Sequence, residues 1–194
     1  MLTPWADTLE RAQPLPEYPR PQMVRDSYLN LNGPWSYAIT TSASKPAQAD
    51  GTILVPFSPE SELSGVGHVL QPEEYLWYIR TVTLPDGFNV GRVLLHFGAV
   101  DQTATVWCNG VELVTHTGGY LPFTVDITEV LAKENTILVC VRDTTNKSQL
   151  PRGKQTLHPH GIWYTPQSGI WQTVWAEHVP ENYVQALLFT PELP

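Results

Sequence analysis

The dipeptide Asn109-Gly110 constrains this chain more than any other feature of its sequence. It lies between two apolar segments, one ending at Cys108 and the other beginning at Val111. Asn and Gly tolerate the positive φ that both central residues of a tight hairpin turn require. The two segments are therefore predicted to pair as antiparallel strands, and the fold has to contain an antiparallel sheet around them.

Alternation of apolar and polar residues continues over much of the chain and predicts further strands. The residues expected to share a face are Tyr78, Arg80, Val82 and Leu84; Val93, Leu95 and Phe97; Ala104, Val106 and Cys108; and Ile137, Val139 and Val141. The stretch 170–177 is apolar on both sides, which predicts a strand covered on both faces. Only 126–133 hints at a helical turn. The expected fold is all-β, a jelly-roll β-sandwich of two antiparallel sheets.

Length and proline content divide the chain into three parts. A chain of 194 residues with 42% hydrophobic content can bury one sizeable core. Residues 1–27 contain five prolines and form an expected arm, interpreted as a strap across the chain's own domain with Trp5 and Tyr18 as anchors. A Pro-rich ligand for another domain is the alternative. Residues 28–180 form the sandwich, and 181–194 are expected to begin a following domain.

Charge and cysteine usage exclude some classes of partner. The formal net charge is -8 and the 11 Lys and Arg are scattered, which opposes binding to nucleic acid or to anionic lipid. The first residues lack the apolar block of a signal peptide, and no stretch is long enough to span a bilayer, so we expect a cytoplasmic protein without membrane contact. Cys108 and Cys140 lie inside strand-like runs and are expected to be free, buried thiols.

Seven blocks of the sequence occur in an order that carries a family resemblance. They are LNGPW at 31–35, VPFSPESELSG at 55–65, WYIR at 77–80, FGAVDQTATVWCNG at 97–110, GGYLPFTVDI at 118–127, RGKQ at 152–155 and SGIWQTVW at 168–175. Together they resemble the N-terminal sugar-binding domain, a galactose-binding-like jelly roll, of glycoside hydrolase family 2. That family contains β-galactosidases, β-glucuronidases and β-mannosidases.

The resemblance implies that the reaction chemistry lies outside this chain. In the family, the jelly roll is followed by an immunoglobulin-like sandwich and by a (β/α)₈ barrel that carries two catalytic glutamates. A barrel alone needs about 250 residues, more than the whole chain. We therefore expect no catalytic residue here, and a parent protein that is a retaining β-glycosidase. The implied partners are a β-glycoside substrate and the following domains of the same chain; a homo-oligomer is compatible with the sequence.

Two loops are the candidates for sugar recognition. The loop 56–66 presents a carboxylate and a hydroxyl, and the long loop 144–168 combines directional donors with aromatic faces, the pairing that sugars require. The resemblance implies that such loops help to shape the sugar pocket. The residues to which this substrate-binding role is carried over are Glu60, Ser61, Arg152, Lys154, Gln155 and His160. Alternatively, Trp163 and Tyr164 seal the edge of the sandwich and Arg152 pairs with a surface carboxylate.

Other residues are given structural interpretations. His158 and His160 lack further ligands for a metal ion, and no cofactor motif is found, so neither a metal nor a cofactor is expected. Trp35, Trp107, Trp171 and Trp175 are assigned to the core, and Asp101 and Asp126 to capping or turn bonding. Two further functions stay open: an independent lectin-like carbohydrate-binding module, and a structural spacer.

Overall fold

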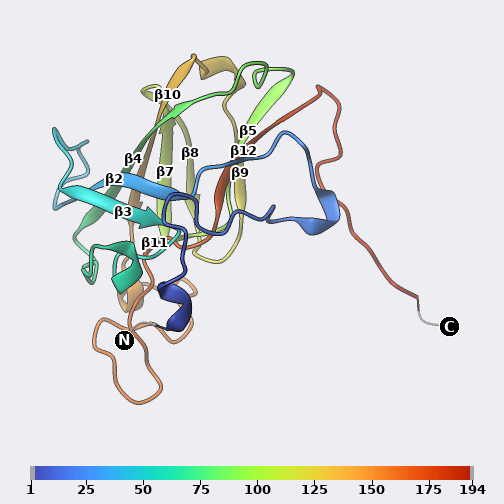
Figure 1. Ribbon diagram of the computed structural model, residues 1–194. Helices are drawn as coiled ribbons and strands as arrows, with labels where there is room; N and C mark the ends of the chain where they lie inside the picture. The colour runs from blue at the N-terminus through green and yellow to red at the C-terminus, as the bar shows by residue number, and fades with distance from the viewer. Residues whose placement is uncertain (1–2, 193–194) are drawn as a thin grey trace.

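A computed structural model describes residues 3–192 and shows two facing antiparallel sheets (Figure 1). The larger sheet has the order β3-β2-β4-β10-β7-β8, and the smaller has the order β1-β12-β5-β9. The strands of the larger sheet are β2 (Gly33–Thr40), β3 (Gly51–Val55), β4 (Tyr75–Thr83), β7 (Thr103–Cys108), β8 (Val111–Thr117) and β10 (Glu134–Arg142). Those of the smaller sheet are β1 (Leu29–Asn30), β5 (Arg92–Phe97), β9 (Phe123–Asp126) and β12 (Val174–Val179).

Short elements complete the fold. A third, two-stranded sheet joins β6 (Val100–Asp101) to β11 (Gly169–Ile170) in antiparallel register. The helical elements of the described residues are single 3₁₀ turns: η1 (Pro4–Ala6), η2 (Pro21–Met23), η3 (Glu62–Ser64), η4 (Thr128–Val130) and η5 (Thr145–Lys147). The predicted all-β antiparallel sandwich is confirmed, and η4 is the predicted helical turn within 126–133.

The predicted hairpin joins β7 to β8. Cys108 lies opposite Val111, and φ is 52° at Asn109 and 83° at Gly110. The Asn109 side chain also fastens the turn to the neighbouring strand, because its Nδ2 donates to Asn135 Oδ1 at 2.9 Å and its Oδ1 accepts from Thr136 N at 2.8 Å. One turn residue therefore supplies both the backbone conformation and the link to β10.

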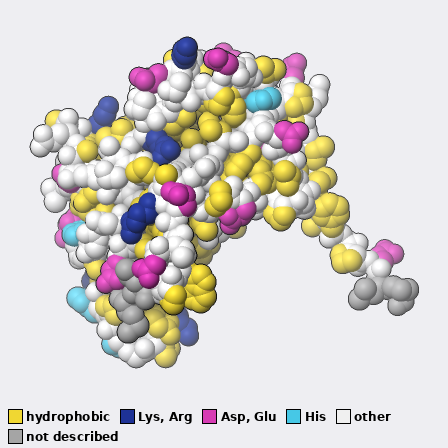
Figure 2. All heavy atoms as spheres, viewed as in Figure 1, with side chains coloured by type: hydrophobic (Ala, Val, Ile, Leu, Met, Phe, Trp, Pro, Cys, Tyr) yellow, Lys and Arg dark blue, Asp and Glu magenta, His cyan; other side chains and the backbone are white. Residues whose placement is uncertain are grey.

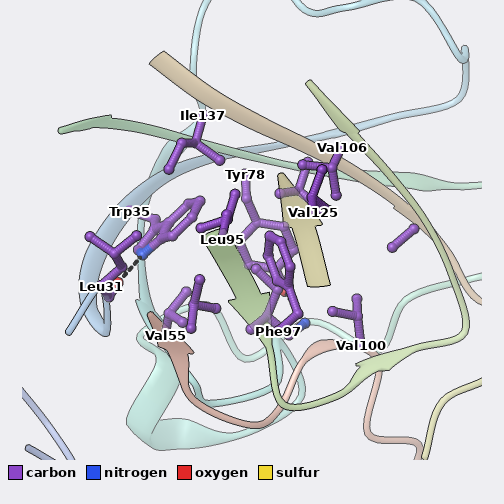
Figure 3. Close-up of a cluster of buried hydrophobic side chains, with 14 of the residues drawn as sticks. Leu31, Trp35, Val55, Tyr78, Leu95, Phe97, Val100, Val106, Val125 and Ile137 are labelled. Carbon is purple, nitrogen blue, oxygen red and sulfur yellow. Dashed lines mark hydrogen bonds between the residues drawn. The ribbon is translucent and has the colours of Figure 1, made fainter. Parts of the chain in front are cut away.

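The core lies between the inner faces of the two sheets (Figure 3). The faces predicted for β5, β7 and β10 are confirmed, since every member of those three sets is at most 2% exposed. Trp35 is 1% exposed, and its indole Nε1 donates to Leu31 O at 2.8 Å, so its polar atom is satisfied inside the core. Arg80 lies on the inner side of β4 but is only partly buried. Its guanidinium lies 5.8 Å from the centre of the Trp35 ring.

Of the four tryptophans assigned to the core, Trp35 and Trp175 are buried, whereas Trp107 and Trp171 are only half-buried. Trp175 is covered by the N-terminal arm and not by the facing sheet. Trp107 lies between the inward residues Val106 and Cys108, so the period of two directs it to the outer face of the sheet. The predicted strand 170–177 is also interrupted, because residues 171–173 separate β11 from β12. Trp171 belongs to that interruption and not to a sheet face.

The N-terminal arm crosses the outer face of the smaller sheet, which confirms the strap interpretation (Figure 1). Its anchor is the fully buried carboxylate of Glu177 in β12, which accepts from Tyr18 at 2.7 Å, Arg20 at 2.6 Å and Arg25 at 2.5 Å. The expected anchoring role of Trp5 is wrong, since its side chain is 77% exposed. Tyr18, the second predicted anchor, therefore holds the arm to the sandwich together with Arg20 and Arg25.

The segment after β12 extends away from the sandwich (Figure 1). As far as residue 192, the strand-like run expected over 183–190 makes no strand pairing. Apolar side chains are exposed along it (Figure 2), and Leu188 is 93% exposed. The alternating pattern of this segment is therefore typical of a strand, but the segment pairs with no strand of the described residues.

Candidate functional site

A pocket of about 260 Å³ lies where the long loop after β10 meets the two-stranded sheet. The orange segment that projects from the sandwich in Figure 1 belongs to this loop. The wall of the pocket combines one carboxyl group, two cations, amides and aromatic rings. Its side-chain members are Asp101, Tyr120, Arg152, Lys154, Gln155, Tyr164, Thr165, Gln167 and Trp171.

The loop reaches the pocket because it doubles back on itself. Tyr164 N donates to Lys154 O at 2.8 Å, and Thr156 N donates to Tyr164 O at 2.9 Å. At the tip, His160 and Trp163 exchange two backbone hydrogen bonds of 3.1 and 2.9 Å. These bonds bring the RGKQ block beside the residues that precede β11, so the functional loop expected from its length is an ordered hairpin-like structure.

Asp101 provides the carboxyl group of the pocket. The residue is 2% exposed, and its Oδ2 accepts a hydrogen bond from Gln155 Nε2 at 2.8 Å. Its Oδ1 has no hydrogen-bond partner among the described residues. A Cβ atom on Gly119 would lie 2.3 Å from this Oδ1, so only glycine leaves room for the carboxyl group. The turn-bonding role expected for Asp101 is therefore wrong, whereas Asp126 does bond the Thr128 amide at 3.0 Å.

The surroundings of Asp101 oppose its ionisation. The pKa of Asp101 is raised to about 7. Burial is the main cause, the hydrogen bond from Gln155 counteracts it, and the nearby carboxylates of Asp143 and Glu60 add to the rise. Near neutral pH the group is present in both protonation states. It can therefore accept a hydrogen bond from a ligand hydroxyl or donate one to it.

Gln155 holds the pocket together through both ends of its amide. Its Nε2 bonds Asp101 and lies 3.4 Å from the Tyr120 hydroxyl, and its Oε1 accepts from Gln167 N at 2.6 Å. The amide is thus engaged by protein groups. Gln155 lines the pocket, and its bonds position Asp101 and Tyr120.

Arg152 and Lys154 give the pocket its positive charge. Arg152 Nε donates to Gln155 O at 3.3 Å, and its guanidinium lies 5.9 Å from the centre of the Trp163 ring. Among residues 3–192 neither cation forms an ion pair, so the alternative pairing of Arg152 with a surface carboxylate is wrong. Lys154 is exposed, and its ammonium makes no hydrogen bond within the described chain. Both side chains retain donors for a ligand.

Aromatic rings supply the apolar part of the wall. Tyr120 and Trp171 meet edge to face with ring centres 6.3 Å apart, and Trp171 Nε1 donates to Gly119 O at 2.8 Å. Tyr164 is 61% exposed. A pyranose ring has an apolar C–H face that packs on such rings, and hydroxyls that bond the neighbouring donors.

The other three predicted residues lie outside the pocket lining. Glu60 is half-buried and accepts from Ser168 N at 3.1 Å and Leu70 N at 3.3 Å, while burial raises its pKa. Ser61 caps η3 through a bond from Leu63 N at 3.1 Å. His160 is at the exposed tip of the loop, where its Nδ1 lies 2.7 Å from His158 O. Glu60 and Ser61 accept hydrogen bonds from backbone amides and do not line the pocket.

Sequence reasoning missed Asp101, Tyr120 and Trp171 as members of the site. Asp101 gave one local signal, since it is a charged residue directly after the apolar run 97–100 and two residues before β7. Tyr120 follows two glycines, a pattern that a turn explains equally well. Only the contact of both residues with Gln155 distinguishes them from ordinary turn residues.

The described residues contain no group of three or more His, Cys, Asp or Glu side chains placed to hold a metal ion. The Nδ1 of His160 lies 2.7 Å from the backbone oxygen of His158 in the same loop. Both cysteines are free; Cys108 is buried and Cys140 half-buried. Within residues 3–192 no helix has the length and apolarity needed to cross a membrane.

An antiparallel sandwich whose loops form a pocket of aromatic, cationic and amide groups has the architecture and chemistry of a carbohydrate-binding domain. Residues 28–180 match the family described as "Glycosyl hydrolases family 2, sugar binding domain". The chain belongs to this family, which confirms the resemblance inferred from its ordered sequence blocks.

Individual relatives are longer proteins. The chain is similar to a β-glucuronidase of Paenibacillus borealis, with 37% identity over 44% of this chain and 16% of the relative. It is also similar to a β-galactosidase of Thermoanaerobacter pseudethanolicus, with 29% identity over 86% of this chain and 23% of the relative. The chain thus spans less than a quarter of the length of these two relatives.

Solved structures of related enzymes share the fold. A β-glucuronidase from Ruminococcus gnavus in complex with D-glucuronic acid matches 85% of this chain and 31% of its own, with a TM-score of 0.63 and 24% identity. A Lactobacillus rhamnosus β-glucuronidase matches 80% of this chain and 29% of its own, with a TM-score of 0.61 and 25% identity.

Proposed function

We propose that this domain serves a retaining β-glycosidase, and that the pocket around Asp101 holds part of the sugar substrate. A retaining glycosidase needs two carboxyl groups about 5 Å apart. Asp101 is the one acidic residue that lines the pocket within residues 3–192. The bond-breaking groups then come from sequence outside these 194 residues, and this domain contributes binding.

The observation that carries the proposal is the free hydrogen-bonding capacity of the pocket. Arg152 and Lys154 keep unused donors, and Asp101 keeps an unpaired oxygen, although buried polar groups are normally satisfied. These groups lie beside the rings of Tyr120, Tyr164 and Trp171. A sugar supplies what both kinds of group lack, namely hydroxyls for the polar atoms and a C–H face for the rings.

The two cations favour an acidic sugar, such as a uronate, among the glycosides that relatives act on. A guanidinium and an ammonium on one wall match a carboxylate by charge and by hydrogen bonding. A neutral β-galactoside is the second candidate, favoured by the β-galactosidase that is similar over 86% of this chain. The two candidate substrates differ in charge: binding of a glucuronide would depend on Arg152 and Lys154, whereas binding of a galactoside would not.

The test uses the longest protein that the surrounding open reading frame encodes. We expect hydrolysis of p-nitrophenyl β-glycosides, with KM for the glucuronide raised about tenfold in Arg152→Gln and Lys154→Gln, the loss of about one charge-assisted hydrogen bond. Lys147→Gln is the matched control, because Lys147 lies in the same loop, is exposed and does not line the pocket. An unchanged KM in both pocket variants would favour the structural spacer instead.

An experiment on the 194-residue chain by itself distinguishes the proposed function from an independent lectin-like module. We expect it to hydrolyse none of these substrates. A lectin-like module would bind free mono- or oligosaccharides with millimolar or tighter affinity in calorimetry without any following domain. Hydrolysis at enzyme-like rates that is lost in Asp101→Asn would contradict the proposal.

A further inference from the structure

A second hollow of about 260 Å³ lies on the outer face of the six-stranded sheet. Its lining includes Lys45, Trp77, Trp107, Gly110, Thr136 and Leu138. The Asp101 pocket adjoins the beginning of β7, whereas this hollow adjoins its end. A strand rises about 3.3 Å per residue, so the six residues of β7 separate the two places by about 17–20 Å.

The floor of the hollow is a fixed aromatic surface. The rings of Trp77 and Trp107 stack with centres 6.0 Å apart and planes inclined by 28°. Trp77 is 2% exposed, and its Nε1 donates to Thr40 Oγ1 at 3.0 Å, which holds the lower ring in place. Trp107 is half-buried and faces outward, with Leu138 beside it. The apolar surface is therefore in place before any ligand arrives.

The rim of the hollow carries hydrogen-bond donors without protein partners. Among residues 3–192, no hydrogen bond is formed by Trp107 Nε1, by the Lys45 ammonium or by the Thr136 hydroxyl. Lys45 and Thr136 are exposed. A flat aromatic floor edged by donors is complementary to a molecule that has one apolar face and a periphery of hydroxyl groups.

We propose that this hollow is a second carbohydrate-binding site, in which a pyranose ring stacks on Trp107 and its hydroxyls accept from Trp107 Nε1 and the Lys45 ammonium. A purely apolar ligand would leave these donors covered and unpaired. Nucleic acid or polyphosphate would require more than one cation, and the net charge of -8 repels both. A stable protein interface buries about 800 Å² per partner, far more than the lining of this hollow offers.

The test is a titration of the ¹⁵N-labelled 194-residue chain with cellobiose, lactose and D-glucuronic acid, followed through the indole N–H signals. Trp107→Phe identifies the Trp107 signal by its loss. We expect at least one of the sugars to move this signal in a saturable way with a millimolar Kd, and Lys45→Met to weaken that Kd about fivefold. Lys45 is exposed, so its replacement leaves the fold intact.

Two controls separate this site from the Asp101 pocket. Asp101→Asn and Lys147→Met leave the Trp107 titration unchanged, because neither residue lines the outer hollow. The signal of Trp5, an exposed tryptophan in the arm, does not move. The proposal would be overturned if the Trp107 signal did not move at tens of millimolar of any of the three sugars. It would also be overturned if that signal moved only with the concentration of the protein. Neither result bears on the Asp101 pocket.

Discussion

Glu177 and Asp101 are two buried carboxyl groups with opposite surroundings. Both are at most 2% exposed. Burial by itself would raise the pKa of Glu177, but hydrogen bonds from His96, Tyr18 and Arg20 outweigh it and bring the pKa to about 2. Asp101 receives one such bond, and its pKa is about 7. Since both groups are buried, the donors and the charges around each one decide its charge state.

This difference distinguishes a structural carboxylate from a functional candidate. Glu177 joins β12 to the N-terminal arm, and its charge is fully used by protein groups. Arg25, one of its partners, also donates to Val184 O at 2.6 Å, so the same cluster holds the segment that leaves the sandwich. Asp101 keeps an unpaired oxygen beside an open pocket. An unsatisfied buried group is a reason to look for a ligand.

Removing the satisfied carboxylate should have the largest effect. Glu177→Ala leaves Arg20 and Arg25 partly buried without their anion, so we expect the free energy of unfolding to fall by about 3–5 kcal/mol in urea denaturation. The contribution of Glu177 is present above pH 4.5 and is lost as the pH falls toward 2, because its folded pKa is lowered. The exposed Glu181→Gln is the control and should stay within about 0.5 kcal/mol.

Crowding the unsatisfied carboxyl group should come next. Gly119→Ala places a methyl group 2.3 Å from Asp101 Oδ1, and we expect a loss of about 1–3 kcal/mol by the same measurement. The double variant Gly119→Ala with Asp101→Ala should recover most of this loss, because the clash disappears with the carboxyl group. Simple additivity of the two changes would show that Gly119 is not required by Asp101.

A smaller effect is expected from one donor of the Glu177 cluster. Tyr18→Phe removes the 2.7 Å hydrogen bond to the carboxylate and should cost about 1.5 kcal/mol, the value of a bond to a charged group. Trp5→Ala in the same arm should stay within about 0.5 kcal/mol, because Trp5 is 77% exposed. Equal losses in the two variants would contradict the assignment of Tyr18 as the anchor.

The last expected effect is a change in the pH dependence of stability. The folded pKa of Asp101 is raised from 3.8 to about 7, so the folded state binds the proton more tightly and stability falls as the pH rises between these values. Asp101→Asn keeps the oxygen that accepts from Gln155 and removes this titration. We expect the variant to match the parent near pH 4 and to be several kcal/mol more stable at pH 8, since each pKa unit of the shift corresponds to about 1.4 kcal/mol. A parent whose stability rises over that interval while the variant's does not would contradict the raised pKa.

Local pattern predicted the strands well and their surroundings less well. The alternation around Val106 fixed which residues of β7 face the core, because a strand turns its side chains by a strict period of two. The same rule directed Trp107 outward, yet aromatic bulk suggested the core. What lies against an outward face depends on segments far away in sequence, such as the arm that covers Trp175, where Arg20 lies 5.3 Å from the ring.

Of the residues that line the pocket, the sequence pointed to those that lie together in one loop. The RGKQ block supplied Arg152, Lys154 and Gln155, because donors and aromatic residues are concentrated in one long loop. Glu60 and Ser61 met backbone amides instead of the pocket. Asp101 was missed because its role depends on Gln155, 54 residues later, and on the missing Cβ of Gly119.

The sequence by itself determined the antiparallel architecture, the hairpin at Asn109-Gly110, the inward faces of the strands and the membership in a sugar-binding family. These features follow from backbone preferences and from a period of two, which act between neighbouring residues. The tertiary structure alone decided which buried carboxyl group is satisfied and which is not. The pKa of Glu177 and Asp101 depends on donors brought from distant strands and loops, and no local pattern encodes how many donors arrive.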